Sequence, residues 1–109
     1  MPYDEALADR VRQVMASHPS VVEKKVFGGL TFMLQGHMCC GVLKEDLVLL
    51  LNLDSWAEAL AEPHARPMDF TGRPMKGMVY IGPEGCQSDD ALRGWVQRAV
   101  SFALSLPAK

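Results

Sequence analysis

Residues 21–52 read VVEKKVFGGLTFMLQGHMCCGVLKEDLVLLLN, and this stretch decides the fold. Side chains at 21–27 and 30–34 alternate in the manner of strands, and 38–43 and 47–52 are short runs rich in apolar residues. Glycines or polar and charged residues separate the runs at 28–29, 35–37 and 44–46, where they favour tight turns. The sequence therefore predicts four short strands in an antiparallel meander.

The last of these strands carries apolar side chains on both of its faces, over residues 47–51. A strand with one solvated face usually alternates between polar and apolar residues. We therefore expect an interior strand, or one that a partner covers.

Helical periodicity flanks this region on both sides. The first helix has Asp4 as its N-cap, ends at 17–20, and buries the stripe Leu7, Val11, Val14 and Met15. The closing helix starts at Ser88 or Asp89 and has a wider stripe, comprising Leu92, Trp95, Val96, Ala99, Val100, Ala103 and Leu104.

A short helix and a fifth strand are expected between these parts. The helix runs over 56–61, with Asp54 or Ser55 as its cap and Pro63 beyond its end, and the strand covers 78–81. The expected fold is α+β: an antiparallel sheet of about five strands, a four-strand meander plus one, with N-terminal, short middle and C-terminal helices on one face. No linker divides the chain, so we expect a single domain over residues 1–109.

Composition excludes several classes of protein. The chain has a formal net charge of −2, and 49% of its residues are hydrophobic and 22% charged, as in ordinary globular proteins. A net negative charge argues against a broadly basic nucleic-acid surface. No run approaches the ~20 apolar residues of a membrane span, and no signal peptide is recognisable, so we expect a cytoplasmic protein.

The three cysteines, Cys39, Cys40 and Cys86, are expected to be reduced thiols. On a strand, His37 and Cys39 would share a face and provide two metal ligands. Zinc needs three or four ligands, usually including a second close pair, and the sequence has none. The favoured interpretation is a turn histidine beside two small buried residues, with no metal and no cofactor.

No catalytic signature stands out. A cysteine nucleophile needs a neighbouring base and a lowered pKa, and the sequence places no histidine near a thiol in space. Asp89 and Asp90 lie where helix caps belong. We therefore expect no enzyme and assign no catalytic residue.

The segment 63–81, PHARPMDFTGRPMKGMVYI, is the one basic region of an acidic chain. Arg66, Arg73 and Lys76, with His64 beside them, are the candidate residues for binding an anion or an acidic partner. The competing interpretation is structural: Arg66 or Arg73 pairs with Asp69 while apolar residues of the segment, Met68, Phe70, Met75 and Met78, pack on the helices.

Several strings resemble the TfoX N-terminal domain family, which is named after the TfoX/Sxy regulators of bacterial competence. They are YDEAL at 3–7, KVFGGLTFM at 25–33, MCCGV at 38–42, the long string PHARPMDFTGRPMKG at 63–77, the last helix with Trp95, and SLP at 105–107. The similarity covers essentially the whole chain.

The resemblance implies an α+β fold like that of secretion chaperones and YjbR-type proteins, in a bacterial cytoplasmic protein that is not an enzyme. In the competence regulators this domain precedes a second, helical domain, and the whole acts with the cyclic-AMP receptor protein at promoters. The sequence ends at Lys109, so a stand-alone domain is expected.

Two hypotheses of different classes follow. The first is a regulatory or protein-interaction module, homodimeric, with protein partners that include the transcription machinery. The alternative is a domain that binds a small anionic ligand through Arg66, Arg73 and Lys76. Direct nucleic-acid binding is not expected, given the acidic balance.

Overall fold

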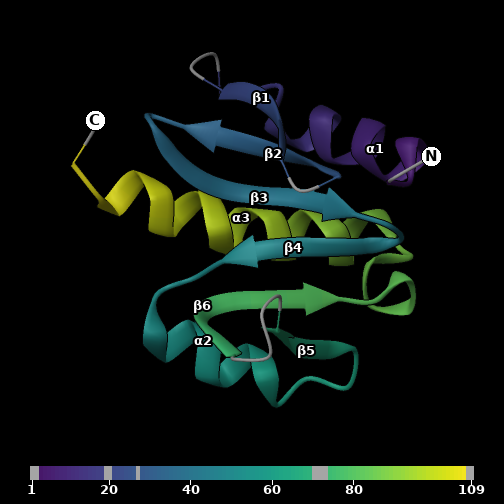
Figure 1. The fold of residues 1–109 in the computed structure, drawn as a ribbon, viewed down its shortest axis with the longest axis vertical. Coiled ribbons are helices and arrows are strands. Elements are labelled where there is room, and N and C mark those ends of the chain that lie inside the picture. The colour runs from purple at the N-terminus through teal and green to yellow at the C-terminus, as the bar shows by residue number, and fades with distance from the viewer. Residues whose placement is uncertain (1–2, 19–20, 27, 70–73, 108–109) are drawn as a thin grey trace.

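The hairpin region folds as its sequence predicts. In the computed structural model, which describes residues 3–18, 21–26, 28–69 and 74–107, strands β1 (Val21–Val26), β2 (Gly29–Leu34), β3 (His37–Leu43) and β4 (Asp46–Leu50) form an antiparallel meander (Figure 1). The side chains of residues 26, 68–69 and 74–76 also lie outside that description. Gln35 and Gly36 both have positive φ, 54° and 84°, as a two-residue hairpin turn requires.

The segment 63–81 completes the sheet. Strands β5 (Ala65–Asp69) and β6 (Pro74–Ile81) pair antiparallel, and β6 lies beside β4, which gives the order β1-β2-β3-β4-β6-β5. The α+β class is confirmed, with one strand more than the expected five or so. Strand β5 is the addition. Pro67 conceals it in the sequence, but β5 is an edge strand, where proline is tolerated.

Three α-helices and one short 3₁₀ helix, η1 (Pro83–Cys86), accompany the sheet in the described chain. Helix α1 (Glu5–Met15) and helix α3 (Asp89–Ser105) begin at the expected caps, Asp4 and Ser88. Helix α2 (Leu53–Leu60) corrects the prediction: its cap is Asn52, whose side chain accepts a hydrogen bond from the Ser55 N–H at 2.8 Å, not Asp54 or Ser55. Strand β4 ends at Leu50, which frees Asn52 for this role. No helix of the described residues is long and apolar enough to span a membrane.

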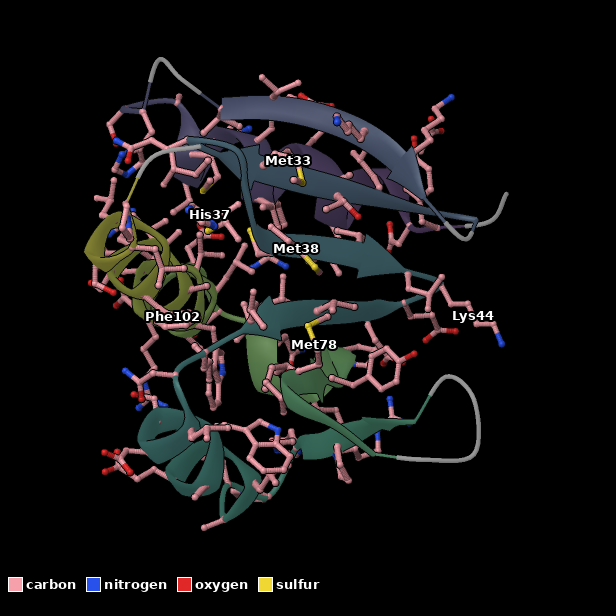
Figure 2. All side chains as sticks on the ribbon, turned by 60° about the vertical axis from the view of Figure 1, so that its left-hand side comes forward. Met33, His37, Met38, Lys44, Met78 and Phe102 are labelled. Atoms are coloured by element: carbon pink, nitrogen blue, oxygen red, sulfur yellow. The ribbon has the colours of Figure 1, made fainter. Side chains whose placement is uncertain are left out.

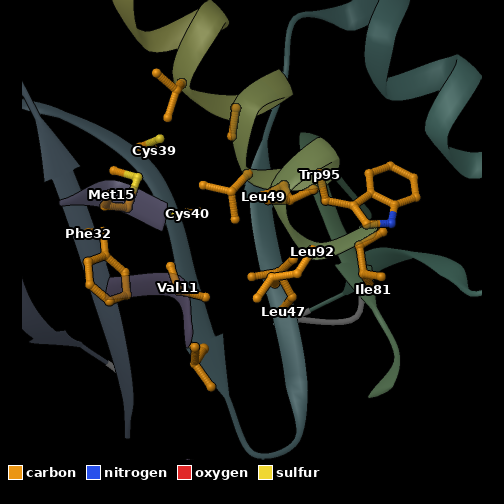
Figure 3. Packing of buried hydrophobic residues seen from close by; sticks show 14 of the residues in the cluster. Val11, Met15, Phe32, Cys39, Cys40, Leu47, Leu49, Ile81, Leu92 and Trp95 are labelled. Atoms are coloured by element: carbon orange, nitrogen blue, oxygen red, sulfur yellow. The ribbon is translucent and has the colours of Figure 1, made fainter. Parts of the chain in front are cut away.

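The core lies between one face of the sheet and the helices. Helix α3 packs across β2, β3 and β4 with α1 beside it, while α2 packs against β5 and β6 (Figure 1). Figure 3 shows the side chains that meet there. The largest of those that are fully buried are Phe32, Leu34, Leu47, Leu49, Leu51, Ile81 and Leu92.

A β-bulge in β3 changes the direction of one side chain. Phe32 pairs with Cys40 and the next residue, Met33, pairs with Met38, so Cys39 is an extra residue in β3. Because of it, Cys39 and Cys40 are both fully buried in the core, whereas strict alternation would send one of them to the opposite face.

Candidate functional site

Arg66, the first of the candidate binding residues, lies on edge strand β5 and has two partners. Its guanidinium donates a hydrogen bond to the Asp46 carboxylate at 2.6 Å, and its Cζ lies 5.2 Å from the centre of the Tyr80 ring. The structural interpretation had given Asp69 as a partner of Arg66 or Arg73, but Asp46 of β4 takes that place for Arg66. Arg66 remains 57% exposed, so the ion pair leaves part of the guanidinium open to solvent.

His64 lies in the turn between α2 and β5. Its Nδ1 is 3.9 Å from Glu84 Oε2, and its side chain packs against Gly85. A Cβ at Gly85 would lie 2.7 Å from the Cβ of His64, so only glycine permits this approach. Glycine at this position therefore helps to set where the imidazole lies.

Hollows lie on both sides of His64. One, of about 230 Å³, is lined by Pro63, His64, Arg66, Gly82, Pro83 and Glu84. The structure thus brings two of the candidate residues, His64 and Arg66, to one concavity. Arg73 lies outside the described residues, and Lys76 belongs to β6 but its side chain is not among those described. The four-residue anion site therefore stays a prediction.

The other hollow, of about 310 Å³, separates the α2–β5 turn from α3. Trp95 forms part of its wall; the indole N–H donates to the Gly85 carbonyl at 3.2 Å, and the Arg98 guanidinium lies over the ring at 4.6 Å. Glu62 and Asp90 line the hollow together with His64 and Arg98. Because both signs of charge meet there, this hollow favours no single class of charged ligand.

The thiols are buried and unsuited to nucleophilic chemistry. A hydrogen bond to the Cys39 thiol, together with the loss of water around the group, raises the pKa of Cys40. Burial likewise raises the pKa of Cys86. Both effects favour the protonated, unreactive thiol at neutral pH.

Metal binding finds no support in the part of the chain that the structure describes. No group of three or more His, Cys, Asp and Glu side chains is placed to hold an ion there. His37, one of the two residues considered as ligands, donates from Nε2 to the Pro107 carbonyl at 2.6 Å. This contact joins the start of β3 to the end of the chain.

The second face of the sheet is also apolar, and the sequence predicted it only in part. Val48 and Met78 are buried on it, at 4% and 7% exposure, by neighbouring side chains of the same face: Met38, Leu43, Leu50 and Tyr80. Met33 shares this face, since it pairs with Met38 (Figure 2). Met78 therefore does not pack under the helices, as the structural interpretation had it. Among the described residues, no helix packs over this cluster.

We call this surface the open face. The apolar residues on both sides of β4 predicted it, but its extent depends on pairings that bring β6 beside β4. Three methionines, Met33, Met38 and Met78, lie on it (Figure 2). Methionine side chains adapt to varied surfaces and are frequent at binding sites. The apolar residues of this face largely screen one another: Val48 and Met78 are buried, and those around them are half-buried.

Comparison with known proteins gives one family. The family model described as TfoX N-terminal domain matches residues 13–103, which is most of the chain. Neither curated proteins nor solved structures yielded a match. The matched range contains the whole sheet and almost all of α3.

Proposed function

The chain belongs to the TfoX N-terminal domain family, and from that premise we propose that it is a non-enzymatic regulatory module that binds a protein partner through its open face. The observation that carries the proposal is the cluster around Val48 and Met78, which is apolar although no described helix covers it. The partner class that the family resemblance suggests is the transcription machinery. The three free, buried thiols are in keeping with a reducing, cytoplasmic setting for such a module.

The absence of catalytic machinery in the described residues supports a binding role over an enzymatic one. The cysteines are buried, and both shifts of thiol pKa run toward the protonated form. Two polar side chains that line the hollows have acidic neighbours: Arg66 donates to Asp46, and His64 Nδ1 lies 3.9 Å from Glu84 Oε2. These arrangements stabilise the fold and provide no activated nucleophile.

Photo-cross-linking from the open face tests this proposal. A photoreactive amino acid replaces Met33 or Met38 in the full chain, in the cells where the protein is native, and mass spectrometry identifies the products. We expect cross-links to a protein from both positions. The matched control is Leu104, an apolar residue of α3 that is 46% exposed and lies on the helix side. If Met33 and Met38 give no more product than Leu104, the open face is not an interaction surface.

A second candidate function rests on the concavity that His64 shares with Arg66. We propose a small carboxylate or phosphate as its ligand, since a guanidinium with free donors binds such groups in a bidentate manner. Arg66 has only one carboxylate partner among the described residues and is more than half exposed. Arg73 and Lys76 are proposed to contribute from the same segment.

Thermal stabilisation by inorganic phosphate or a dicarboxylate measures this binding. Arg66→Gln should abolish the rise in Tm while the ligand-free protein stays folded. Arg93→Gln is the matched control, because Arg93 is also 57% exposed and lies on α3. Equal stabilisation of both variants would exclude Arg66 as the ligand site.

A further inference from the structure

We propose that the hollow of about 310 Å³ between the α2–β5 turn and α3 binds a small zwitterion with an apolar body, that is, a free amino acid or a dipeptide. The hollow lies apart from the open face and on the other side of His64 from Arg66, so the inference rests on neither function proposed above. Its basis is a cation and an anion that line one hollow without pairing, together with a glycine that the fold does not require.

Arg98 is the cation of the hollow, and it has no acidic partner in the described part of the chain. Its guanidinium lies over the Trp95 ring at 4.6 Å, and no described carboxylate lies within ion-pair distance of it. Stacking on the indole holds the guanidinium beside the hollow but uses none of its N–H donors. These donors are therefore available to a carboxylate, which a guanidinium binds in a bidentate manner.

Glu62 is the corresponding anion, on the opposite wall. It follows α2, and among the described residues it forms no ion pair, with Arg98 or with any other cation. Asp90 of α3 adds a second carboxylate, whose nearest cation, the Arg93 guanidinium, is 3.8 Å away and too distant for a hydrogen bond. The hollow therefore offers carboxylates to an ammonium group as well as a guanidinium to a carboxylate.

The charges on the α3 wall lie at its two ends. Asp90 and Arg98 are about two helical turns apart, roughly 12 Å along the axis, and the wall between them is formed by Ala91, Gly94 and Trp95. An anion or a cation would match one end and leave the other unmatched. A zwitterion with an apolar body matches both ends and the uncharged stretch between them.

Gly94 is the second observation that indicates an occupant. Glycine inside a helix is destabilising relative to alanine, so it calls for a reason. A Cβ at this position would meet no atom within 4 Å, and Gly94 does not have positive φ. Neither close packing nor backbone conformation therefore explains the glycine. Because Gly94 lines the hollow, the missing side chain leaves space for a ligand beside the helix.

The size of the hollow limits the ligand. A volume of about 310 Å³ is at the lower end of the usual range for small-molecule sites, about 300–1,000 Å³, which suits an amino acid or a dipeptide better than a large cofactor. Glu62 and Arg98 are both exposed, so water screens their charges and the affinity should be modest. Binding assays therefore need millimolar ligand.

Nuclear magnetic resonance of the full chain tests the site, with L-leucine and leucyl-leucine as separate probes. The chain has two tryptophans. Trp95 lines the hollow, whereas the indole N–H of Trp56 donates to the Met78 carbonyl and serves as the internal reference. We expect at least one probe to shift the Trp95 indole resonance in a saturable manner and to leave that of Trp56 in place. The tighter probe identifies the source of the ligand. If neither probe shifts the Trp95 resonance, the proposal is wrong.

Analogues with a single charge test whether both charges are recognised. N-acetyl-L-leucine lacks the ammonium group and L-leucinamide lacks the carboxylate. Each should bind about ten-fold more weakly than L-leucine or worse, because each loses a charge-assisted hydrogen bond. Equal binding of either analogue would overturn the zwitterion site.

Two variants remove the charges of the hollow one at a time. Arg98→Gln and Glu62→Gln should each weaken binding by about ten-fold or more. The matched controls are Arg93→Gln on α3 and Glu58→Gln on α2, which change exposed residues that do not line this hollow and should not weaken binding. Equal affinity of the two sets of variants would overturn the assignment of Arg98 and Glu62.

Gly94→Leu separates ligand binding from stability. Leucine is a better helix former than glycine and meets no atom at its Cβ, so the variant should keep or raise the Tm. Its side chain enters the hollow and should abolish binding. Binding that survives this change would overturn the site. Arg66→Gln, which should abolish stabilisation by phosphate, should leave amino-acid binding unchanged, so the two proposed ligand sites can fail independently.

Discussion

The two faces of the sheet are made by the same strands, yet they differ in what covers them. On β4, Leu47 and Leu49 are fully buried beneath helices, whereas Val48 and Leu50 face the other way and, among the described residues, pack against neighbouring side chains of the sheet and not against a helix. These four side chains of β4 are all aliphatic, whichever face they occupy. An apolar pattern therefore specifies that a face of the sheet must be buried, but it does not specify which element buries that face.

The covered face should dominate the free energy of unfolding, and adjacent residues of β2 test this most directly. Phe32 points into the core with 0% exposure, and Met33 points to the open face. Phe32→Ala should lower the free energy of unfolding by about 3–5 kcal/mol, since it removes a buried ring and leaves a cavity. Urea denaturation at low protein concentration measures the change.

Met33→Ala is the internal control for this comparison. Met33 is only partly buried, so its truncation in the monomer should cost about 1 kcal/mol or less. Equal losses at the two positions would mean that the open face contributes to stability as much as the covered face does.

Much of this architecture could be predicted from the sequence, because its signals are local. The caps Asp4 and Ser88, the hairpin turn at Gln35 and Gly36, and the stripe on α3 depend on near neighbours. Each lies where expected, except that Leu104 of the predicted stripe is 46% exposed. Strand β5 was missed because Pro67 is unfavourable in an interior strand, and only the sheet order reveals that β5 is an edge.

Less of the candidate site could be predicted, because its contacts join distant parts of the chain. The ion pair of Arg66 with Asp46 joins β5 to β4, and the approach of His64 to Gly85 joins the α2–β5 turn to η1. No spacing in the sequence encodes such pairs. The bulge at Cys39 is a third example, since an alternating pattern cannot indicate where the alternation fails.

The second prediction concerns the buried thiols of Cys40 and Cys86, and the change in stability that we expect from them is of intermediate size. Because the pKa of Cys40 and that of Cys86 are raised in the folded chain, the folded state holds protons that the unfolded state loses first. The stabilisation is complete below the ordinary thiol pKa of about 8.5 and decreases as the pH rises above it. Stability should fall by ~1 kcal/mol per pH unit for each such thiol in that range.

Urea denaturation at neutral pH and near the alkaline end of the stable range measures this slope. Cys40→Ala should flatten it, because one of the two shifted groups is gone, even though the variant is less stable at every pH. An unchanged slope would mean that Cys40 does not contribute to the alkaline loss of stability.

The smallest expected effect is at the sheet edge, where the Glu23 carboxylate accepts hydrogen bonds from Arg12 at 2.7 and 2.8 Å and ties α1 to β1. These bonds lower the pKa of Glu23, so the stabilisation is present above its ordinary pKa and is lost as the pH falls below about 4. Glu23 and Arg12 are 36% and 45% exposed, and solvent screening limits the effect to about 0.5 kcal/mol.

Glu23→Gln should therefore lower the free energy of unfolding by that amount at neutral pH and by less in acid. Glu58→Gln, on the exposed side of α2, should change it at neither pH. A loss of several kcal/mol at Glu23 would show instead that the covered face depends on this edge contact to hold α1 in place.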